Sequence, residues 1–202
     1  MKNRLLIHAC CAPCLVAVYD DTIKNMTNMD IDEFDVIWHN TNIHPKIEYE
    51  KRKETFISYV NSMGKTPIMI DEYNMNKFIS DVVNLDKTKY KMRCEYCYVS
   101  RLEKVFEYAK ENGYTHVTTT LLISPFQKHD VIRKVCESLA KKYDVIFLYK
   151  DYRPLFEEGQ KKAKELGIYR QKYCGCVYSI DESGYRVDVK KKIRNGKFEL
   201  II

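Results

Sequence analysis

Apolar residues along this chain alternate between short continuous runs and longer stretches with helical spacing. Residues 4–9 contain the apolar run Leu5-Leu6-Ile7, which predicts a buried strand. Residues 130–142 instead place Val131, Val135 and Leu139 about one helical turn apart. The same reasoning predicts further strands at 34–39, 67–70, 115–123 and 144–149, and further helices at 15–26, 46–62, 76–83, 96–111 and 155–166.

Strands separated by helices of these lengths are typical of an α/β fold with a mostly parallel sheet and helices on both faces. No interdomain linker, internal repeat or low-complexity stretch interrupts the pattern, so we expect residues 1–180 to form a single domain. Residues 181–202 differ from the rest and look like an appended basic extension. An Asn-Gly pair within this extension is a hairpin signal.

The bulk composition supports a globular protein and excludes a membrane protein. The 202 residues are 45% hydrophobic and 31% charged, which is ordinary for a globular chain. No apolar run approaches the roughly 20 residues that a membrane span requires. The apolar run near the N-terminus is too short for the core of a secretory signal. We therefore expect a cytoplasmic protein with no membrane partner.

The cysteines are the main candidates for chemistry. Disulfides are rare in the cytoplasm, so the eight cysteines of this chain point to metal or redox use instead. Cys136 stands alone on the apolar side of a predicted helix, and we expect it to be a small core residue. The other seven fall into three clusters, which are Cys10, Cys11 and Cys14; Cys94 and Cys97; and Cys174 and Cys176.

Each cluster occupies a position that suits ligand binding. The first follows the strand at 4–9, and open parallel sheets bind ligands in such loops beyond the carboxyl ends of their strands. The second opens a predicted helix, and in the third Gly175 lets the backbone approach a neighbour closely. Thiolates without obvious histidine partners suit an iron–sulfur cluster or zinc. Seven sulfurs exceed the four of one site, which indicates two metal centres, or one centre and a reactive thiol pair.

Three other classes of protein fit part of this pattern. A cytosolic dithiol oxidoreductase would use Cys11 and Cys14 and leave the other clusters without a role. A zinc-stabilised tRNA-binding module would need four thiols and no catalysis. An ATP-using tRNA thiolase or pyrophosphatase would share the fold, but this chain has HACCAPC where a Ser/Gly-rich phosphate loop is expected.

Taken together, six segments of the chain resemble the epoxyqueuosine reductases of the QueH family. The resemblance implies a Rossmann-like fold related to adenine-nucleotide hydrolases, and a [4Fe–4S] cluster beside a second metal ion. It also implies a tRNA substrate that carries epoxyqueuosine at the wobble position, queuosine as the product, and an electron donor that the sequence does not name. The six segments are HACCAPC (8–14), NTNIHPKIEYEKR (40–52), RCEYCYVSRL (93–102), THVTTTLLISPFQKH (115–129), KDYRP (150–154) and YRQKYCGCVYS (169–179).

The resemblance also assigns roles to individual residues. We expect the second metal ion to be a mononuclear iron that acts as a Lewis acid on the epoxide oxygen, which gives Cys11 and Cys14 a catalytic role. Loss of the oxygen also needs protons, and His44 and His129 are the expected catalytic histidines because both lie in loops after strands. The expected cluster ligands are Cys10, Cys94, Cys97 and Cys176, and those of the second iron are Cys11, Cys14 and Cys174, with Cys10 and Cys11 interchangeable.

A net charge of +6 permits tRNA binding. Basic residues near the clusters are the expected phosphate contacts, and tyrosines interleaved with them are candidates for stacking on anticodon-loop bases. The basic set is Lys89, Lys91, Arg93, Arg153, Arg170 and Lys172, together with Arg101; the tyrosines are Tyr90, Tyr152, Tyr169 and Tyr173.

Overall fold

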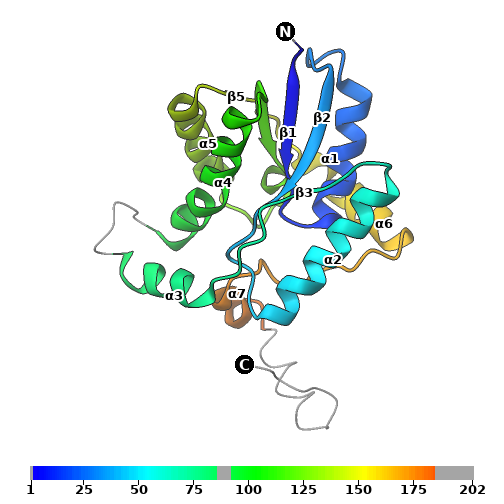
Figure 1. The fold of residues 1–202 in the computed structure, drawn as a ribbon. Helices are drawn as coiled ribbons and strands as arrows, with labels where there is room; N and C mark the ends of the chain where they lie inside the picture. The colour runs from blue at the N-terminus through cyan, green and yellow to red at the C-terminus, as the bar shows by residue number, and fades with distance from the viewer. Residues whose placement is uncertain (1, 86–91, 185–202) are drawn as a thin grey trace.

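The computed structural model describes residues 2–85 and 92–184 (Figure 1). Within these residues five strands form one parallel sheet in the order β3-β2-β1-β4-β5. The predicted α/β architecture with a parallel sheet is thus confirmed, and the first strand is central, as its apolar run indicated. The strands are β1 (Arg4–His8), β2 (Glu33–Trp38), β3 (Ile68–Met69), β4 (His116–Thr119) and β5 (Ile146–Phe147).

Helices cover both faces of the sheet. In Figure 1, α1 and α6 pack together on one side, and α4 and α5 pack together on the other. Gly159 of α6 allows the close approach to α1, because a Cβ there would lie 2.9 Å from the Cβ of Ala17. The α-helices are α1 (Ala12–Asn25), α2 (Lys46–Ser62), α3 (Met75–Val83), α4 (Arg93–Glu111), α5 (His129–Tyr143), α6 (Phe156–Glu165) and α7 (Val177–Glu182), with short 3-10 helices η2 (Thr120–Ile123) and η3 (Arg153–Leu155).

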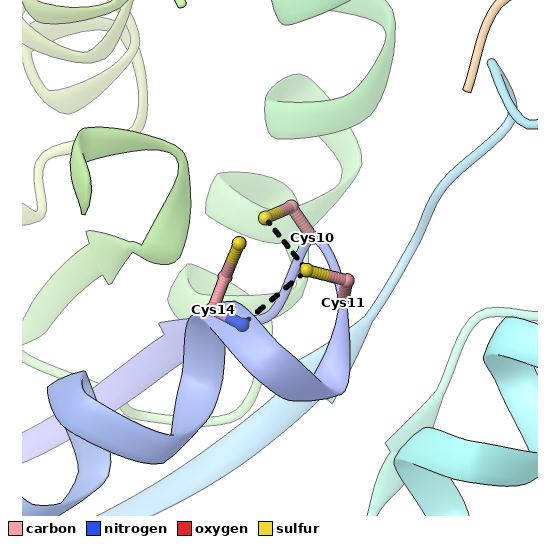
Figure 2. Close-up of side chains that lie close together, drawn as sticks. All are labelled: Cys10, Cys11 and Cys14. Carbon is pink, nitrogen blue, oxygen red and sulfur yellow. Dashed lines mark hydrogen bonds between the residues drawn. The ribbon is translucent and has the colours of Figure 1, made fainter. Parts of the chain in front are cut away.

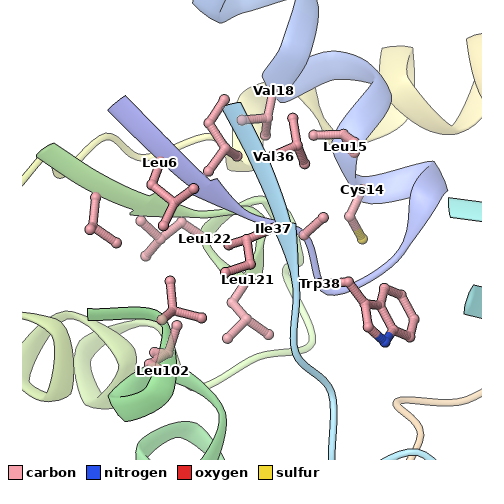
Figure 3. Packing of buried hydrophobic residues seen from close by; sticks show 14 of the residues in the cluster. Leu6, Cys14, Leu15, Val18, Val36, Ile37, Trp38, Leu102, Leu121 and Leu122 are labelled. Atoms are coloured by element: carbon pink, nitrogen blue, oxygen red, sulfur yellow. The ribbon is translucent and has the colours of Figure 1, made fainter. Parts of the chain in front are cut away.

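The core is built on the central strand. Leu5, Leu6 and Ile7 are fully buried, as expected for a parallel strand covered on both faces. Figure 3 shows side chains of α1 on one side of the strands and Leu102 of α4 on the other. Cys136 is also fully buried in this core, so its predicted structural role is confirmed.

The carboxyl ends of β1 and β2 point toward α3 and α7, which lie beyond that edge of the sheet in Figure 1. This edge gathers the segments that carry the sulfurs, because β1, β2 and β4 are parallel neighbours and all end there. The element α7 was not expected from the sequence. It follows Cys176 directly and lies beyond this edge of the sheet (Figure 1).

All five strands differ from the predictions at one end or both, and two of the differences have a clear local cause. The strand expected at 115–123 ends at Thr119, where its partner β1 also ends, and the chain turns into η2. The Thr119 hydroxyl accepts a hydrogen bond from the Leu121 backbone N–H at 3.2 Å and starts that turn. The strand expected at 144–149 shrinks to Ile146–Phe147, because Asp144 adopts a left-handed conformation that ends α5.

A hairpin was expected within residues 181–202. The structure describes only 181–184 of this segment, so the hairpin lies outside the described residues. Across the part of the chain that the structure does describe, no helix combines the length and apolar character of a membrane span.

Candidate metal centre

Three sulfurs meet in the loop between β1 and α1. The Cys10 backbone N–H donates to the Thr120 hydroxyl at 2.9 Å, which fixes the loop against η2. Cys11 caps α1, because its Sγ accepts a hydrogen bond from the Cys14 backbone N–H at 3.4 Å. Pro13 fits the first turn because a helix has no internal partner for that N–H. The sulfurs of Cys10, Cys11 and Cys14 consequently all lie within 4.8 Å of one another (Figure 2).

The ionisation of these three thiols is linked. Hydrogen bonds from Cys11 and Cys14 hold the pKa of Cys10 well below its usual value. Burial raises the pKa of Cys11, and hydrogen bonding to Cys10 and Cys11 raises that of Cys14. The group therefore holds one negative charge readily, at Cys10, and resists a second and third. A bound cation would remove that resistance by neutralising the added charge.

The remaining four clustered cysteines come from two segments. Cys94 and Cys97 lie in the first turn of α4, as predicted, and Cys97 is buried beside Cys176 in a small apolar cluster with Phe78. Burial raises the pKa of Cys94, and that of Cys97 to about 12, while nearby Cys174 and Cys176 add to both shifts. These cysteines thus share one region. Among the described residues, however, only Cys10, Cys11 and Cys14 bring three sulfurs within 4.8 Å.

Arg101 lies between the two sets of thiols. It is 2% exposed, and it donates hydrogen bonds to Asn40 Oδ1 and to the Cys97 side chain. Burial alone would lower the pKa of Arg101, but Cys97, Cys10 and Cys174 raise it. The expectation that Arg101 contacts phosphate on the surface is therefore wrong. Its guanidinium is a buried positive charge inside the thiol centre.

A network of backbone hydrogen bonds fixes the Cys174-Gly175-Cys176 turn. Arg52 of α2 donates to the backbone oxygens of Cys174 and Tyr173, each at 3.1 Å. The His44 backbone N–H donates to the oxygen of Gly175 at 2.8 Å. Gly175 has φ +132, and a Cβ there would lie 3.0 Å from Asn42 Nδ2 and 3.2 Å from Arg52 Nη1. The predicted close approach of the backbone at Gly175 is confirmed.

The loop after β2 buries several polar groups without partners. His44 is 1% exposed, and within the described part of the chain neither of its ring nitrogens has a hydrogen-bond partner. Burial lowers the pKa of His44 to about 4, so the ring is neutral at pH 7. The side-chain amide of Asn42 is also fully buried, and neither its oxygen nor its nitrogen has a partner among the described residues. Such groups are costly to bury and mark places where a ligand or water completes the hydrogen bonding.

His129 is the first residue of α5, also on the carboxyl edge. Its Nε2 lies 3.2 Å from the Tyr149 hydroxyl, and its buried Nδ1 has no hydrogen-bond partner among the described residues. Within the described residues neither His129 nor His44 hydrogen-bonds a cysteine side chain. The structure therefore places both histidines at the predicted edge of the sheet without a hydrogen bond to the sulfurs.

Two glutamines that the sequence patterns did not single out contact the sulfurs. Gln171 Nε2 lies 2.9 Å from Cys11 Sγ, and Gln127 Nε2 lies 3.3 Å from Cys174 Sγ. Thr120 adds a third contact, to Cys10 Sγ at 3.1 Å. Their positions in the sequence could have indicated these contacts. Gln171 shortly precedes a cysteine pair, and Gln127 follows a strand of the sheet.

The expected tRNA contacts divide into three groups. Lys89, Lys91 and Tyr90 lie outside the described residues. Arg93 is paired with Glu182 at 2.5 Å, and Arg153 with Asp151 at 2.6 Å. Arg170 and Lys172 are exposed on either side of Gln171.

The tyrosines proposed for stacking need correction. Tyr152 is fully buried, and Tyr173 is 7% exposed with its hydroxyl bonded to the backbone oxygen of His44. Both are therefore structural residues and offer no ring face to a base. Tyr169 is half-buried and donates to Glu48 at 2.8 Å.

Comparison with known proteins decides the family. The model of the family described as "Epoxyqueuosine reductase QueH" matches residues 5–182. The chain belongs to this family. Two curated QueH relatives are the epoxyqueuosine reductases of Dehalococcoides mccartyi, at 36% identity over 89% of this chain and 93% of the relative, and of Thermotoga maritima, at 34% identity over 88% and 91%.

The solved structures show that this QueH chain has a known fold. The U34-tRNA thiolase NcsA from Methanococcus maripaludis, solved with its [4Fe–4S] cluster, superposes with a TM-score of 0.53. The alignment covers 96% of this chain and 68% of NcsA at 13% identity, so the likeness is one of fold. It agrees with the Rossmann-like sheet of the present structure.

Proposed function

We propose that the thiol centre at the carboxyl edge of the sheet is the active site of an epoxyqueuosine reductase. The family supplies the activity: the protein is an oxidoreductase of queuosine biosynthesis. The reaction opens the epoxide of epoxyqueuosine at the wobble position of tRNA. Two electrons and two protons convert the epoxide to an alkene, and its oxygen leaves as water. The observation that carries the location is the convergence of sulfurs at the end of the central strand.

The thiol geometry fits a bound metal. A tetrahedral ion with metal–sulfur bonds of about 2.3 Å separates its thiolate ligands by roughly 3.8 Å. The Sγ atoms of Cys10 and Cys11 lie 3.8 Å apart, and all three sulfurs of the loop lie within 4.8 Å. A donor set made only of thiolates suits iron–sulfur chemistry or a thiophilic ion. These residues therefore suit both a [4Fe–4S] cluster and an adjacent mononuclear iron.

The sulfur positions favour one division of the thiols. Cys10 lies with Cys11 and Cys14, and we assign these three to the mononuclear iron. The other clustered thiols, which leave out the buried Cys136, are then the four that a [4Fe–4S] cluster requires. The division in which Cys10 joins the cluster and Cys174 joins the iron remains the alternative, and a Cys10 variant separates the two. The four thiols of the first division are Cys94, Cys97, Cys174 and Cys176.

The protein side chains prepare this site for the reaction. When bound, the cluster supplies electrons and the iron supplies a Lewis acid. The burial of Cys11 and Cys14 keeps bulk water from the reacting oxygen. Arg101 places a positive charge where negative charge accumulates on the thiolates. Neutral His44 has an unpaired ring N–H to offer the substrate, and His129 holds or passes a proton together with Tyr149.

Exposed basic residues beside the centre support binding of the tRNA backbone. Arg170 and Lys172 flank Gln171, which itself contacts Cys11. Arg93, Arg153, Lys89 and Lys91 complete the proposed phosphate contacts. The proposal requires an electron donor that reduces the cluster by one or two electrons at a time, and it names no particular donor.

The test is anaerobic purification followed by metal analysis and an activity assay. We expect a brown protein with about four sulfides and four to five irons per chain. It should form queuosine on tRNA that carries epoxyqueuosine when dithionite supplies electrons. Zinc without sulfide would instead identify a tRNA-binding module, and a metal-free active protein would identify a dithiol enzyme.

Single cysteine variants then test the division of thiols. Cys94→Ala and Cys97→Ala should lose both the visible absorption and the turnover. Cys11→Ala and Cys14→Ala should keep most of the cluster absorption yet lose more than about a hundredfold in turnover, because the Lewis acid contributes several kcal/mol. Cys10→Ala should behave like Cys11→Ala; if it bleaches the cluster, the alternative division is correct. If Cys11→Ala and Cys14→Ala turn over at the native rate, the loop between β1 and α1 has no role in the mechanism.

A further inference from the structure

The loop between η2 and α5 exposes a phenylalanine. Phe126 is 83% exposed, the highest value among the large hydrophobic side chains in the described part of the chain, followed by Val83 at 67%. Its backbone N–H bonds the Ser124 hydroxyl at 3.3 Å, and the Gln127 N–H bonds the Ser124 backbone oxygen, also at 3.3 Å. The turn is therefore hydrogen-bonded on both sides of the ring.

An edge contact to Phe156 partly covers this ring. The two ring centroids lie 6.0 Å apart at an interplanar angle of 79°. An edge-to-face contact of this kind orients a ring while leaving one face free. A scattered exposed apolar residue is ordinary on a protein surface. Phe126 differs because of where the loop holds it.

The neighbouring residue in the loop touches the thiol centre. Gln127 donates to Cys174 Sγ at 3.3 Å and accepts a hydrogen bond from the Tyr98 hydroxyl at 2.9 Å. The Lys128 backbone N–H also bonds the Tyr98 hydroxyl, at 3.1 Å. Since adjacent Cα atoms are about 3.8 Å apart, Phe126 stands at the rim of the proposed active site.

Basic side chains lie near the ring along the chain, together with the acidic Glu157 and Glu158 that follow Phe156. Lys128 is exposed two residues along the chain, and Arg153 is exposed in η3, just before Phe156. Arg170 and Lys172 are exposed on the segment that reaches Cys11 through Gln171. An aromatic face among cations is how proteins bind single-stranded nucleic acid, because the base stacks on the ring while the cations contact phosphates.

We propose that Phe126 is a stacking platform for an unpaired anticodon-loop base that neighbours the wobble nucleotide. The inference rests on the proposed function, because it takes the tRNA as substrate and the thiol centre as the place of the modified nucleotide. Phe126 contacts a base that does not react, so its contribution is to the affinity for the tRNA. The chemical step depends on other residues.

Binding of an anticodon stem–loop RNA to the anaerobically reconstituted holoenzyme tests the proposal. Phe126→Ala should raise the Kd about 5- to 100-fold, since one base–aromatic stack has that value in alanine substitutions. Phe126→Trp should restore the Kd to within about twofold of wild type. A 2-aminopurine at the stacked position should be quenched by wild type and by Phe126→Trp, and not by Phe126→Ala. Iron, sulfide and turnover at saturating tRNA should stay unchanged in all three.

The control removes an equally apolar but distant side chain. Ile23 is 51% exposed near the far end of α1, about 18 Å along the helix axis from the thiol loop. Ile23→Ala should bind the stem–loop as wild type does. An unchanged Kd in Phe126→Ala would overturn the proposal.

Two further outcomes distinguish base stacking from a different role of the ring. Phe126→Ala could bind RNA normally yet lose turnover only when reduced ferredoxin replaces dithionite. The ring would then contact a protein electron donor, and the stacking proposal would fail. Absence of queuosine formation by wild type would instead refute the proposed function, whatever Phe126 does.

Discussion

At the scale of single residues, the most informative side chain is the buried Arg101. Burying a guanidinium is costly unless negative charge compensates it. The compensating groups in the described structure are thiols of both sets, Cys97, Cys10 and Cys174, rather than a carboxylate. Neutral thiols would compensate poorly. The burial of Arg101 thus agrees with a centre whose cysteines are thiolates bound to metal.

We predict that Arg101 sets the reduction potential of the cluster. In Arg101→Gln the loss of a nearby positive charge should make the cluster harder to reduce, so its midpoint potential should fall. Arg101→Lys keeps the charge and should shift the potential less. An anaerobic redox titration followed by EPR measures both. Arg153→Gln, which removes an exposed arginine paired with Asp151, is the control. Equal potentials in all four proteins would contradict this role.

We predict a purely structural effect at Cys136. This thiol is fully buried in the core and belongs to none of the three clusters. Cys136→Ala should retain iron and activity and lose about 1 kcal/mol of unfolding free energy through a small cavity. Chemical denaturation and iron analysis measure the two effects. Loss of iron would show that the grouping of the cysteines is wrong.

At the scale of elements, the thiol centre depends on how one irregular segment is held. The residues from Tyr173 to Cys176 carry two sulfurs, and no strand or helix contains them. Arg52 of α2 and the backbone of His44 fix this segment through its own backbone groups. Its sulfurs are thus positioned by hydrogen bonds to the loop after β2.

We predict that Gly175→Ala disrupts this support. The added Cβ would meet Asn42 and Arg52 at 3.0 and 3.2 Å, in a backbone conformation that alanine rarely adopts. Iron occupancy and stability should both fall. Gly167→Ala is the matched control, because Gly167 also has a positive φ of +66 but has no atom within 4 Å of the added Cβ. Iron retention in Gly175→Ala equal to that of Gly167→Ala would show that the close packing is unimportant.

At the scale of the whole molecule, the proposed metal centre joins segments that the sheet alone does not hold. The loop after β1 and the core are packed without it, whereas Tyr173–Ser179 depends on a few hydrogen bonds. Metal ligation should therefore contribute most to the order of the second region.

We predict that removal of iron loosens the molecule unevenly. Anaerobic chelation should increase amide hydrogen exchange in 173–179 and in the first turn of α4, because those backbones lose their metal-bound sulfurs. Exchange in β1 and β4 should change little, since these strands are buried in the core. Uniformly faster exchange would mean instead that the metal stabilises the entire fold.

The sequence was enough to predict the alternating fold and the edge at which the cysteines meet. Both follow from local periodicity and from the rule that parallel strands end at a common edge. It could not show which sulfurs lie closest, because that depends on how residues 169–176 return across the edge. It also assigned Arg101 and Tyr173 to RNA contacts, since residue type indicates charge or aromaticity and says nothing of burial.

The spacing of the cysteine segments also constrains how the protein matures. The sulfurs come from residues 10–14, 94–97 and 174–176, so the last pair is synthesised long after the first. A ribosome-bound chain that has only just passed Cys97 still lacks β4, one of the three strands that end at this edge, and the last two clustered thiols. The complete set of ligands therefore exists only after translation has passed Cys176. The proposed iron centre can accordingly be completed only after residue 176 has been synthesised.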